Sequence, residues 1–377
     1  MISCGEPSGD LYAAALTTEI LRADPAAHIT GFGGNRLRAA GASLVGDFSG
    51  LSVTGLMEVA RVLPRTYATY RRLVHDAKTS RPDVFVAVDF PDFNFRLAAA
   101  VRKLGVPIVY YISPQLWAWR RGRMKTMRRI ADCVLVIFPF EEAIYREAGV
   151  PVRWVGHPLL DLTSVPEPRS SFLTRLSLDP DRPVAALLPG SRRNEVHAIL
   201  PDLVEAAARI RARLPDVQWI VARAPHLPDE VFAPLATLGA GLAVVEQRTD
   251  DVLAAADVAL VASGTVTVQA ALHQCPMVVV YRLSPLTYRL GKPFVHVDTY
   301  AMANLVAGRR VVPELIQEAF TPERVAAEAL RVLTDRAYAD NVRAGLAEVR
   351  GKLGTPGASR RAAAAVLEVA RRGRREP

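Results

Sequence analysis

The chain has 377 residues, 50% of them hydrophobic, and a formal net charge of +9. That length exceeds what one hydrophobic core usually supports, so two domains of roughly 150 to 190 residues are expected. The positive charge favours an anionic partner, which could be nucleic acid, an anionic lipid surface or a phosphorylated substrate. The longest apolar run, 134–140, is too short to span a bilayer, so we expect at most a peripheral membrane contact. The three scattered cysteines indicate neither a disulfide framework nor a zinc site, so we expect a cytoplasmic protein.

Strands and helices alternate through most of the chain. A short first strand at 2–4 leads through a glycine turn, 5–10, into a helix over 11–22. Further strands are predicted at 84–88, 107–112, 133–138, 184–188, 218–221, 242–245, 258–261 and 277–281. Helical patterns separate most of them, for example at 95–104, 140–147 and 199–213. This alternation predicts parallel sheets covered by helices on both faces.

A proline-rich stretch interrupts the pattern at 161–183, and we place the hinge near residue 165. The predicted domains are therefore 1–165 and 166–350. After residue 320 the pattern is wholly helical, with Thr321 and Pro322 as a helix start and a last helix over 359–372. Because no strand remains for that helix to cover, we expect the segment 351–377 to pack back on the N-terminal domain.

Near the midpoint, the strand 184–188 runs into a polar turn. Pro189 and Gly190 break the strand, and Ser191 and Arg192 precede the next helical pattern. A turn of free backbone N–H groups at a helix N-terminus binds anions readily, so phosphate is the predicted ligand.

A second such turn follows the strand 258–261 and contains Ser263, Gly264 and Thr265. Two turns at neighbouring strand ends favour a shared diphosphate, to which Arg192 would add charge-assisted bonds. Ordinary α/β loops use the same residues, which is the alternative for either turn. The spacing matches neither a Walker A motif nor G-x-G-x-x-G, which disfavours a kinase or a dehydrogenase.

Two carboxylates, Asp89 and Asp92, follow the strand 84–88 in the first half. Catalytic groups gather at such strand ends, and a partly desolvated Asp there would serve as a general base. The alternative is an Asp that caps the following helix. On the next strand end, Trp117 and Trp119 precede a basic run that starts at Arg120. These rings would stack on sugars or bases or pack on acyl chains, whereas the alternative places Trp117 in the core.

Together these blocks resemble one known family, lipid-A-disaccharide synthase. The match runs almost end to end, and the block Ser-Pro-Gln-Leu-Trp-Ala-Trp-Arg at 113–120 is especially specific. The blocks, in the family's order, are 5–10, 51–59, 89–94, 111–120, 138–141, 155–158, 188–195, 263–265, 276–282 and 304–317.

The resemblance implies an inverting glycosyltransferase of GT-B architecture, with two Rossmann-like domains and an interdomain cleft. It implies transfer of 2,3-diacylglucosamine from its UDP derivative to the 6-hydroxyl of 2,3-diacylglucosamine 1-phosphate, with release of UDP. No cofactor or metal is implied.

By motif, Asp92 corresponds to the general base, with Glu6 and Ser8 nearby on the acceptor side. Asp89, Trp117, Trp119 and Arg120 are assigned to the acceptor or membrane side. The donor ligands are expected to be Gly190, Ser191, Arg192, Ser263, Gly264, Thr265, Gln269 and Asn304. Gln269 stands where the family usually has Glu, so it brings a hydrogen-bonding group without charge to the ribose.

Diacylated substrates reside in a membrane leaflet. The stretch 51–70 is apolar with Arg61, Arg65, Arg71 and Arg72 towards its far end, which predicts peripheral contact with the cytoplasmic face of the inner membrane. An amphipathic core helix is the alternative. Two other functions were weighed: another GT-B transferase or epimerase acting on a soluble UDP-hexosamine, and a basic nucleic-acid-binding protein, which no recognised motif supports.

Overall fold

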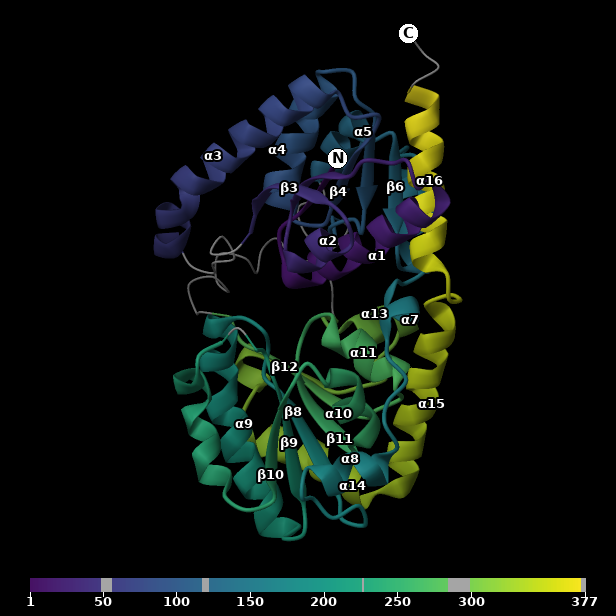
Figure 1. The fold of residues 1–377 in the computed structure, drawn as a ribbon. Coiled ribbons are helices and arrows are strands. Elements are labelled where there is room, and N and C mark those ends of the chain that lie inside the picture. Colours follow the sequence, from purple (N-terminus) through teal and green to yellow (C-terminus); the bar gives the residue numbers. More distant parts are fainter. Residues whose placement is uncertain (49–55, 117–121, 226, 284–298, 374–377) are drawn as a thin grey trace. The chain divides into compact units, whose positions relative to one another are not determined.

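The computed structural model describes residues 1–48, 56–116, 122–225, 227–283 and 299–373. The chain divides into two compact units (Figure 1). Unit 1 comprises Met1–Leu162 and Leu353–Pro377, and unit 2 comprises Thr163–Lys352. Each unit has a hydrophobic core of its own.

Unit 1 is built on seven parallel strands. Its elements are β1 (Ile2–Cys4), α1 (Pro7–Ala23), β2 (Thr30–Gly33), α2 (Asn35–Ala39), β3 (Ser43–Asp47), α3 (Leu56–Ser80), β4 (Phe85–Val88), α4 (Pro91–Arg102), β5 (Ile108–Tyr111), α5 (Arg123–Ile130), β6 (Cys133–Val136), α6 (Pro139–Glu147), β7 (Val152–Trp154), α7 (Leu159–Leu162) and α16 (Ala358–Gly373). The strand order is β3-β2-β1-β4-β5-β6-β7. Every residue of β4, β5 and β6 is buried, which explains their continuous apolar sequence.

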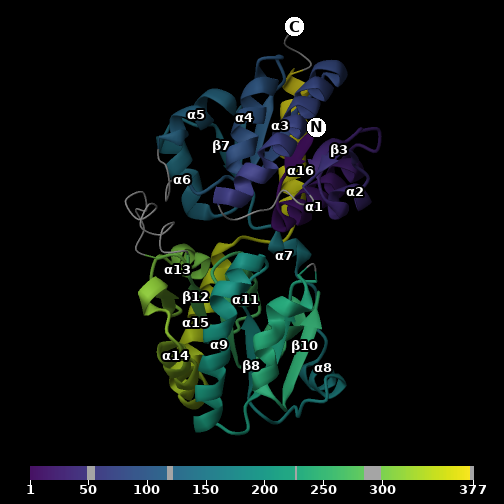
Figure 2. The ribbon, with the colours of Figure 1, turned by 90° about the vertical axis from the view of Figure 1, so that its left-hand side faces the viewer.

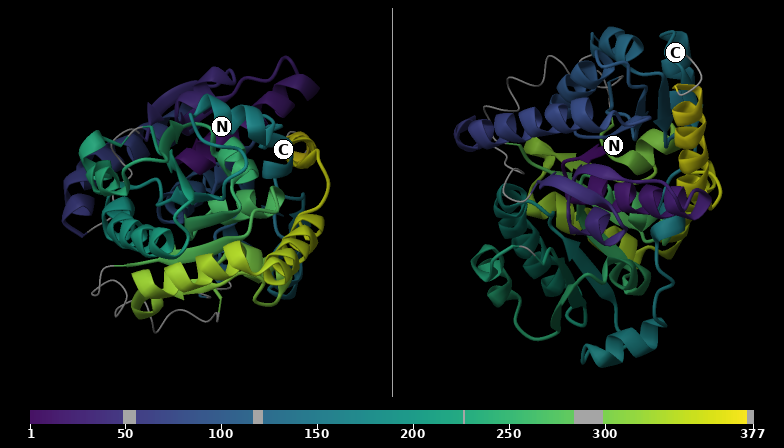
Figure 3. Two further views of the ribbon diagram at one scale, coloured as in Figure 1. Left: turned by 90° about the horizontal axis from the view of Figure 1, so that it is seen from below. Right: turned by 45° about the horizontal axis from the view of Figure 1, so that its top comes forward.

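The helices of unit 1 pack on this sheet and on one another. The long α3 lies against α4 and β3 (Figure 3). From the other end of the chain, α16 packs along α1. A bidentate ion pair between Arg153 of β7 and Glu368 of α16 adds to that attachment.

Unit 2 is built on six parallel strands. Its elements are α8 (Arg169–Arg175), β8 (Val184–Leu188), α9 (Arg193–Arg213), β9 (Gln218–Arg223), η1 (Asp229–Leu238), β10 (Leu242–Glu246), α10 (Thr249–Ala255), β11 (Val258–Ala262), α11 (Val266–Leu272), β12 (Met277–Tyr281), α13 (Met302–Ala307), β13 (Glu314–Ile316), η3 (Gln317–Ala319), α14 (Pro322–Thr334) and α15 (Arg336–Lys352). The strand order is β10-β9-β8-β11-β12-β13. The helix α9 packs against α14 and η1 (Figure 2).

The predicted fold class, two Rossmann-like α/β halves, is confirmed by these two parallel sheets. The predicted helix start at Thr321 is also confirmed, because the Thr321 hydroxyl accepts from the N–H of Arg324. Four short strands, β2, β3, β7 and β13, were not predicted. Three of them, β3, β7 and β13, lie at sheet edges, where partial exposure removes the apolar run.

Candidate functional site

The first candidate loops lie at the point where the strand order of unit 1 reverses. The strands β1 and β4 are neighbours, and the chain leaves them in opposite directions across the sheet. Ligands of open α/β sheets bind outside the carboxyl ends of strands at such a switch point. Glu6 and Ser8 lie in the loop after β1 and the first turn of α1, and Asp89 and Asp92 lie in the loop after β4 and the first turn of α4, so the topology brings these four residues to one edge.

Close packing of the two loops explains a glycine in the first. A Cβ on Gly5 would overlap the ring of Phe90. Asp89 and Phe90 both adopt the left-handed backbone conformation, with φ of 44° and 50°. Non-glycine residues rarely adopt it, and such strain concentrates at functional sites.

A buried amide holds this strained turn. The Nδ2 of Asn94 donates to the carbonyl oxygens of Ser3, Val88 and Asp89, and its Oδ1 accepts from the Ser3 hydroxyl at 2.7 Å. Tyr110 donates its hydroxyl to the Asp89 carbonyl at 2.9 Å. Burial, followed by the charge of Asp89, raises the pKa of Tyr110, so the phenol stays protonated and remains a donor. Sequence reasoning missed Asn94 as the residue that ties β1 to the turn after β4.

Asp92 lies in the first turn of α4, with 74% of its side chain exposed, and it pairs with Arg123 of α5 at 2.5 Å. The predicted partial desolvation is therefore wrong for Asp92. The capping alternative is wrong as well, because α4 begins at Pro91 and its N-cap residue, Phe90, makes no side-chain cap. Asp89, in contrast, is half-buried.

The other residues predicted in unit 1 fall into three groups. Glu6 and Ser8 are half-buried at the start of α1. Asp10 of the same motif is buried and accepts from the N–H groups of Gly34, Arg36 and Leu37, so it caps α2 instead of facing a ligand. The residues Trp117, Trp119 and Arg120 lie outside the described part of the chain.

The second set of candidate loops lies at the switch point of unit 2, between the neighbouring strands β8 and β11. The loop after β8 carries Gly190, Ser191 and Arg192, and α9 begins at Arg193. Gly190 has a φ of 120°, which favours glycine, and a Cβ there would overlap the Glu195 side chain.

The backbone donors of this loop are already used within the chain. Glu195 accepts from the N–H of Ser191 at 3.1 Å and from that of Arg192 at 3.4 Å. The expectation of free N–H groups is therefore wrong for these two. A carboxylate nonetheless occupies the place predicted for an anion, as the polarity of a helix N-terminus favours.

The loop after β11 carries the remaining turn residues. Ser263 is half-buried, whereas Gly264 and Thr265 are exposed. The helix α11 follows, and Gln269 lies half-buried on it. The adjacent strands thus bring the two predicted turns to one edge of the unit 2 sheet.

Asn304, which was predicted as a donor contact, is buried and hydrogen-bonded within unit 2. Its side chain is 1% exposed. The Nδ2 donates to the Val312 carbonyl and to Glu314, and the Oδ1 accepts from the N–H groups of Val311 and Val312. All four hydrogen-bonding positions of the amide are therefore occupied. These bonds tie α13 to the segment that leads into β13.

His157, in the segment that follows β7, is a buried imidazole. It is 2% exposed, and burial lowers its pKa to about 3. Its Nδ1 accepts from the N–H of Leu159 at 3.2 Å. The imidazole therefore stays neutral at physiological pH.

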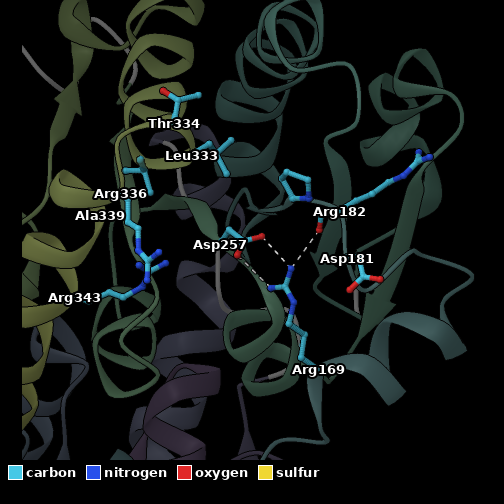
Figure 4. Close-up of a pocket in the computed structure, with 11 residues that line it drawn as sticks. Arg169, Asp181, Arg182, Asp257, Leu333, Thr334, Arg336, Ala339 and Arg343 are labelled. Atoms are coloured by element: carbon cyan, nitrogen blue, oxygen red, sulfur yellow. Dashed lines mark hydrogen bonds and ion pairs between the residues drawn. The ribbon is translucent and has the colours of Figure 1, made fainter.

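A pocket of about 330 Å³ in unit 2 is lined by arginines but lies away from these loops (Figure 4). It includes Pro183, just before β8, and Asp257, just before β11, so it lies at the amino ends of the strands. Arg169 is held there by Asp257 and by the Arg182 carbonyl. None of the residues predicted to bind the diphosphate lines this pocket, so it is separate from the predicted site.

Comparison with known proteins places the whole chain in one group. A family model described as lipid-A-disaccharide synthetase matches residues 1–369. The lipid-A-disaccharide synthase of Geobacter sulfurreducens is 46% identical over 373 residues, covering 98% of this chain and 96% of that protein. The enzyme of the same name from Myxococcus xanthus is 45% identical over 375 residues, covering 99% and 98%.

Solved structures agree with the fold. The UDP-GlcNAc 2-epimerase of Neisseria meningitidis aligns over 97% of this chain and 98% of its own, with a TM-score of 0.66 and 12% identity. MurG of Acinetobacter baumannii aligns over 98% of each chain, with a TM-score of 0.60 and 15% identity. These likenesses confirm the predicted GT-B type of architecture.

Proposed function

Because the chain belongs to the lipid-A-disaccharide synthase family, we propose that it transfers 2,3-diacylglucosamine from its UDP derivative to 2,3-diacylglucosamine 1-phosphate. Membership makes it a glycosyltransferase of lipid A biosynthesis. The acceptor's 6-hydroxyl oxygen attacks the anomeric carbon with inversion, and UDP leaves with the electrons of the broken bond. The full-length family match carries this proposal, and the loops at both switch points supply the chemistry.

Asp92 is the proposed general base, and it accepts the proton of the attacking hydroxyl. Its exposed carboxylate at the carboxyl edge of the unit 1 sheet is accessible to a substrate. Glu6 and Ser8 reach the same edge from the loop after β1 and are proposed to orient the acceptor sugar. A positioned base of this kind contributes about 10² to 10⁴ in rate.

The loops of unit 2 are proposed to hold the UDP part of the donor. Arg192, with the loops after β8 and β11, would meet the charge that grows on the departing diphosphate. The donor's diphosphate would take the place of the Glu195 carboxylate on the N–H groups of Ser191 and Arg192, since two anions cannot share them favourably. Gln269 is proposed to bond the ribose hydroxyls.

The direct test measures UDP release and disaccharide formation with purified protein. We expect release only when UDP-2,3-diacylglucosamine and 2,3-diacylglucosamine 1-phosphate are both present, with one UDP per disaccharide. The matched control replaces the donor by UDP-N-acetylglucosamine, which lacks the long acyl chains and should give no product. Turnover or epimerisation of that soluble sugar nucleotide alone would contradict the proposal and favour the hexosamine enzymes considered above.

We also propose that the enzyme binds peripherally to anionic membranes through α3. Among the described residues, no helix has the length and apolar character needed to cross a membrane. On α3, Leu63 and Tyr67 are 58% and 61% exposed, and the exposed cations Arg65, Arg71 and Arg72 lie near them. Exposed apolar groups beside arginines favour the surface of an anionic leaflet.

A vesicle experiment checks this surface. We expect the protein to float with phosphatidylglycerol vesicles at low salt and to dissociate as salt screens the arginines. The double variant Leu63→Ser and Tyr67→Ser should bind more weakly because it buries less apolar area in the interface. Val165→Ser is the control, since Val165 is 96% exposed but lies outside α3. Equal flotation of all three proteins would contradict the assignment to α3.

A further inference from the structure

The proposed base does not stand alone. The carboxylate of Asp92 on α4 is joined to the guanidinium of Arg123 on α5, with 2.5 Å between Arg123 Nη2 and Asp92 Oδ1. The two residues come from neighbouring helices of unit 1. The side chains of Arg123 and Asp92 are 31% and 74% exposed, so solvent reaches both members of the pair.

The position of Arg123 is fixed by its surroundings. It is the first residue of α5, and its guanidinium lies over the ring of Phe95, 5.6 Å from the ring centre. The charges of Arg123, Asp89 and Asp92 all act on the Tyr110 hydroxyl, which places the four groups in one electrostatic neighbourhood. The helix α5 contains four basic residues and no acidic one, so Asp92 supplies a carboxylate to a cationic element.

The ion pair with Arg123 makes Asp92 a weaker proton acceptor. A carboxylate that takes a proton from a hydroxyl loses the charge that holds the guanidinium, so the charge-assisted bond weakens as the proton arrives. The cost disappears if another anion takes the guanidinium first. The proposed acceptor brings that anion, because its anomeric carbon carries a phosphate.

The geometry of the acceptor suits such an exchange. In a glucosamine ring, the carbon that carries the phosphate and the carbon that carries the CH₂OH group both bond to the ring oxygen. These two carbons therefore flank the ring oxygen, so the phosphate and the 6-hydroxyl lie at the same end of one sugar ring. Arg123 and Asp92 contact each other, so the cation and the base can reach the phosphate and the 6-hydroxyl of one sugar together.

On the basis of the proposed function, we propose that Arg123 binds the anomeric phosphate of the acceptor and, in doing so, releases Asp92 to accept the 6-hydroxyl proton. Arginine suits this task because its planar fork matches phosphate oxygens in a bidentate way. Arg123 thus selects for a phosphorylated acceptor and couples that recognition to the availability of the base. The proton passes from the hydroxyl to Asp92, and the phosphate undergoes no covalent change.

The test compares two acceptors, 2,3-diacylglucosamine 1-phosphate and 2,3-diacylglucosamine without phosphate, with the same donor. The measured quantity is the ratio of their kcat/KM values. We expect the wild-type enzyme to prefer the phosphorylated acceptor and Arg123→Gln to lose about ten- to a hundredfold of that preference. The loss should fall on the phosphorylated acceptor, whereas turnover of the other acceptor should be retained. Arg123→Lys keeps a charge without the fork and should retain part of the preference.

The surface pair of Arg146 and Glu142 on α6 supplies the matched control. Arg146→Gln removes a similar exposed ion pair of unit 1 and should leave the preference unchanged. An unchanged preference in Arg123→Gln would overturn the inference, because a merely structural arginine affects both acceptors alike. If Arg123→Gln fails to fold, the ratio in Arg123→Lys decides. Absence of any wild-type turnover is a different outcome, since it refutes the proposed function itself.

Discussion

Asp92→Asn is expected to lower kcat by about 10² to 10⁴ at saturating concentrations of both substrates. Asparagine has nearly the same shape but cannot accept the proton of the attacking hydroxyl. The variant should fold normally, because Asp92 is 74% exposed and ion pairs at the surface contribute only about 0 to 1 kcal/mol. The measurements are single-turnover rates of disaccharide formation, with thermal unfolding as the check on folding.

Glu142→Gln is the matched control for Asp92→Asn. It also replaces an ion-paired carboxylate in the first turn of a helix of unit 1, and its pair with Arg146 lies on the surface. Its turnover should equal that of the wild type. If Asp92→Asn kept turnover within a factor of about two, below the range expected of a lost general base, the base would have to be sought in Asp89 or Glu6.

Arg192→Gln is expected to lower kcat by about 10² to 10³, the usual effect of losing one donor to developing negative charge. The leaving diphosphate gathers charge as its bond to the sugar breaks, and the proposed role of Arg192, at the start of α9, is to meet that charge. Arg192→Lys should recover part of the rate, because lysine keeps the charge without the bidentate fork. Steady-state turnover and UDP affinity by calorimetry check both variants.

The next residue along the chain provides the control for Arg192. Arg193 is exposed and is the first residue of α9. Arg193→Gln removes the same charge from the same helix terminus but not from the half-buried position of Arg192. Equal losses in the two variants would show that only the general field of the terminus matters, which would contradict a specific diphosphate contact.

Sequence patterns were informative where a strand is fully buried. Residues 184–188 and 258–261 were predicted as strands because parallel strands covered on both faces need continuous apolar side chains, and the structure places β8 and β11 there. The apolar pattern did not predict β2, whose four residues include Gly31 and Gly33, or the partly exposed edge strand β3. Such strands form because a neighbour offers hydrogen bonds, which local sequence does not record.

Candidate site residues were likewise recognisable in the sequence where the signal is local, and not where it depends on a distant partner. The turn residues Gly190 to Arg192 stood out because a strand, a glycine turn and a helix follow one another in sequence. The role of Asn94 did not stand out, because its partner Ser3 is 91 residues away. Asn304 was assigned to the donor by resemblance alone, and its four internal hydrogen bonds to the segment before β13 could not be read from the sequence.

By itself, the sequence determined the family and the α/β class and singled out the candidate loops, because these depend on local periodicity and on contiguous motifs. The tertiary structure decided the strand orders, which bring the loops after β1 and β4 together and do the same for those after β8 and β11. It also decided that Asp92 meets Arg123 and that Glu195 occupies the N–H groups of Ser191 and Arg192. Those contacts depend on how helices and loops pack in three dimensions, and no spacing along the chain encodes them.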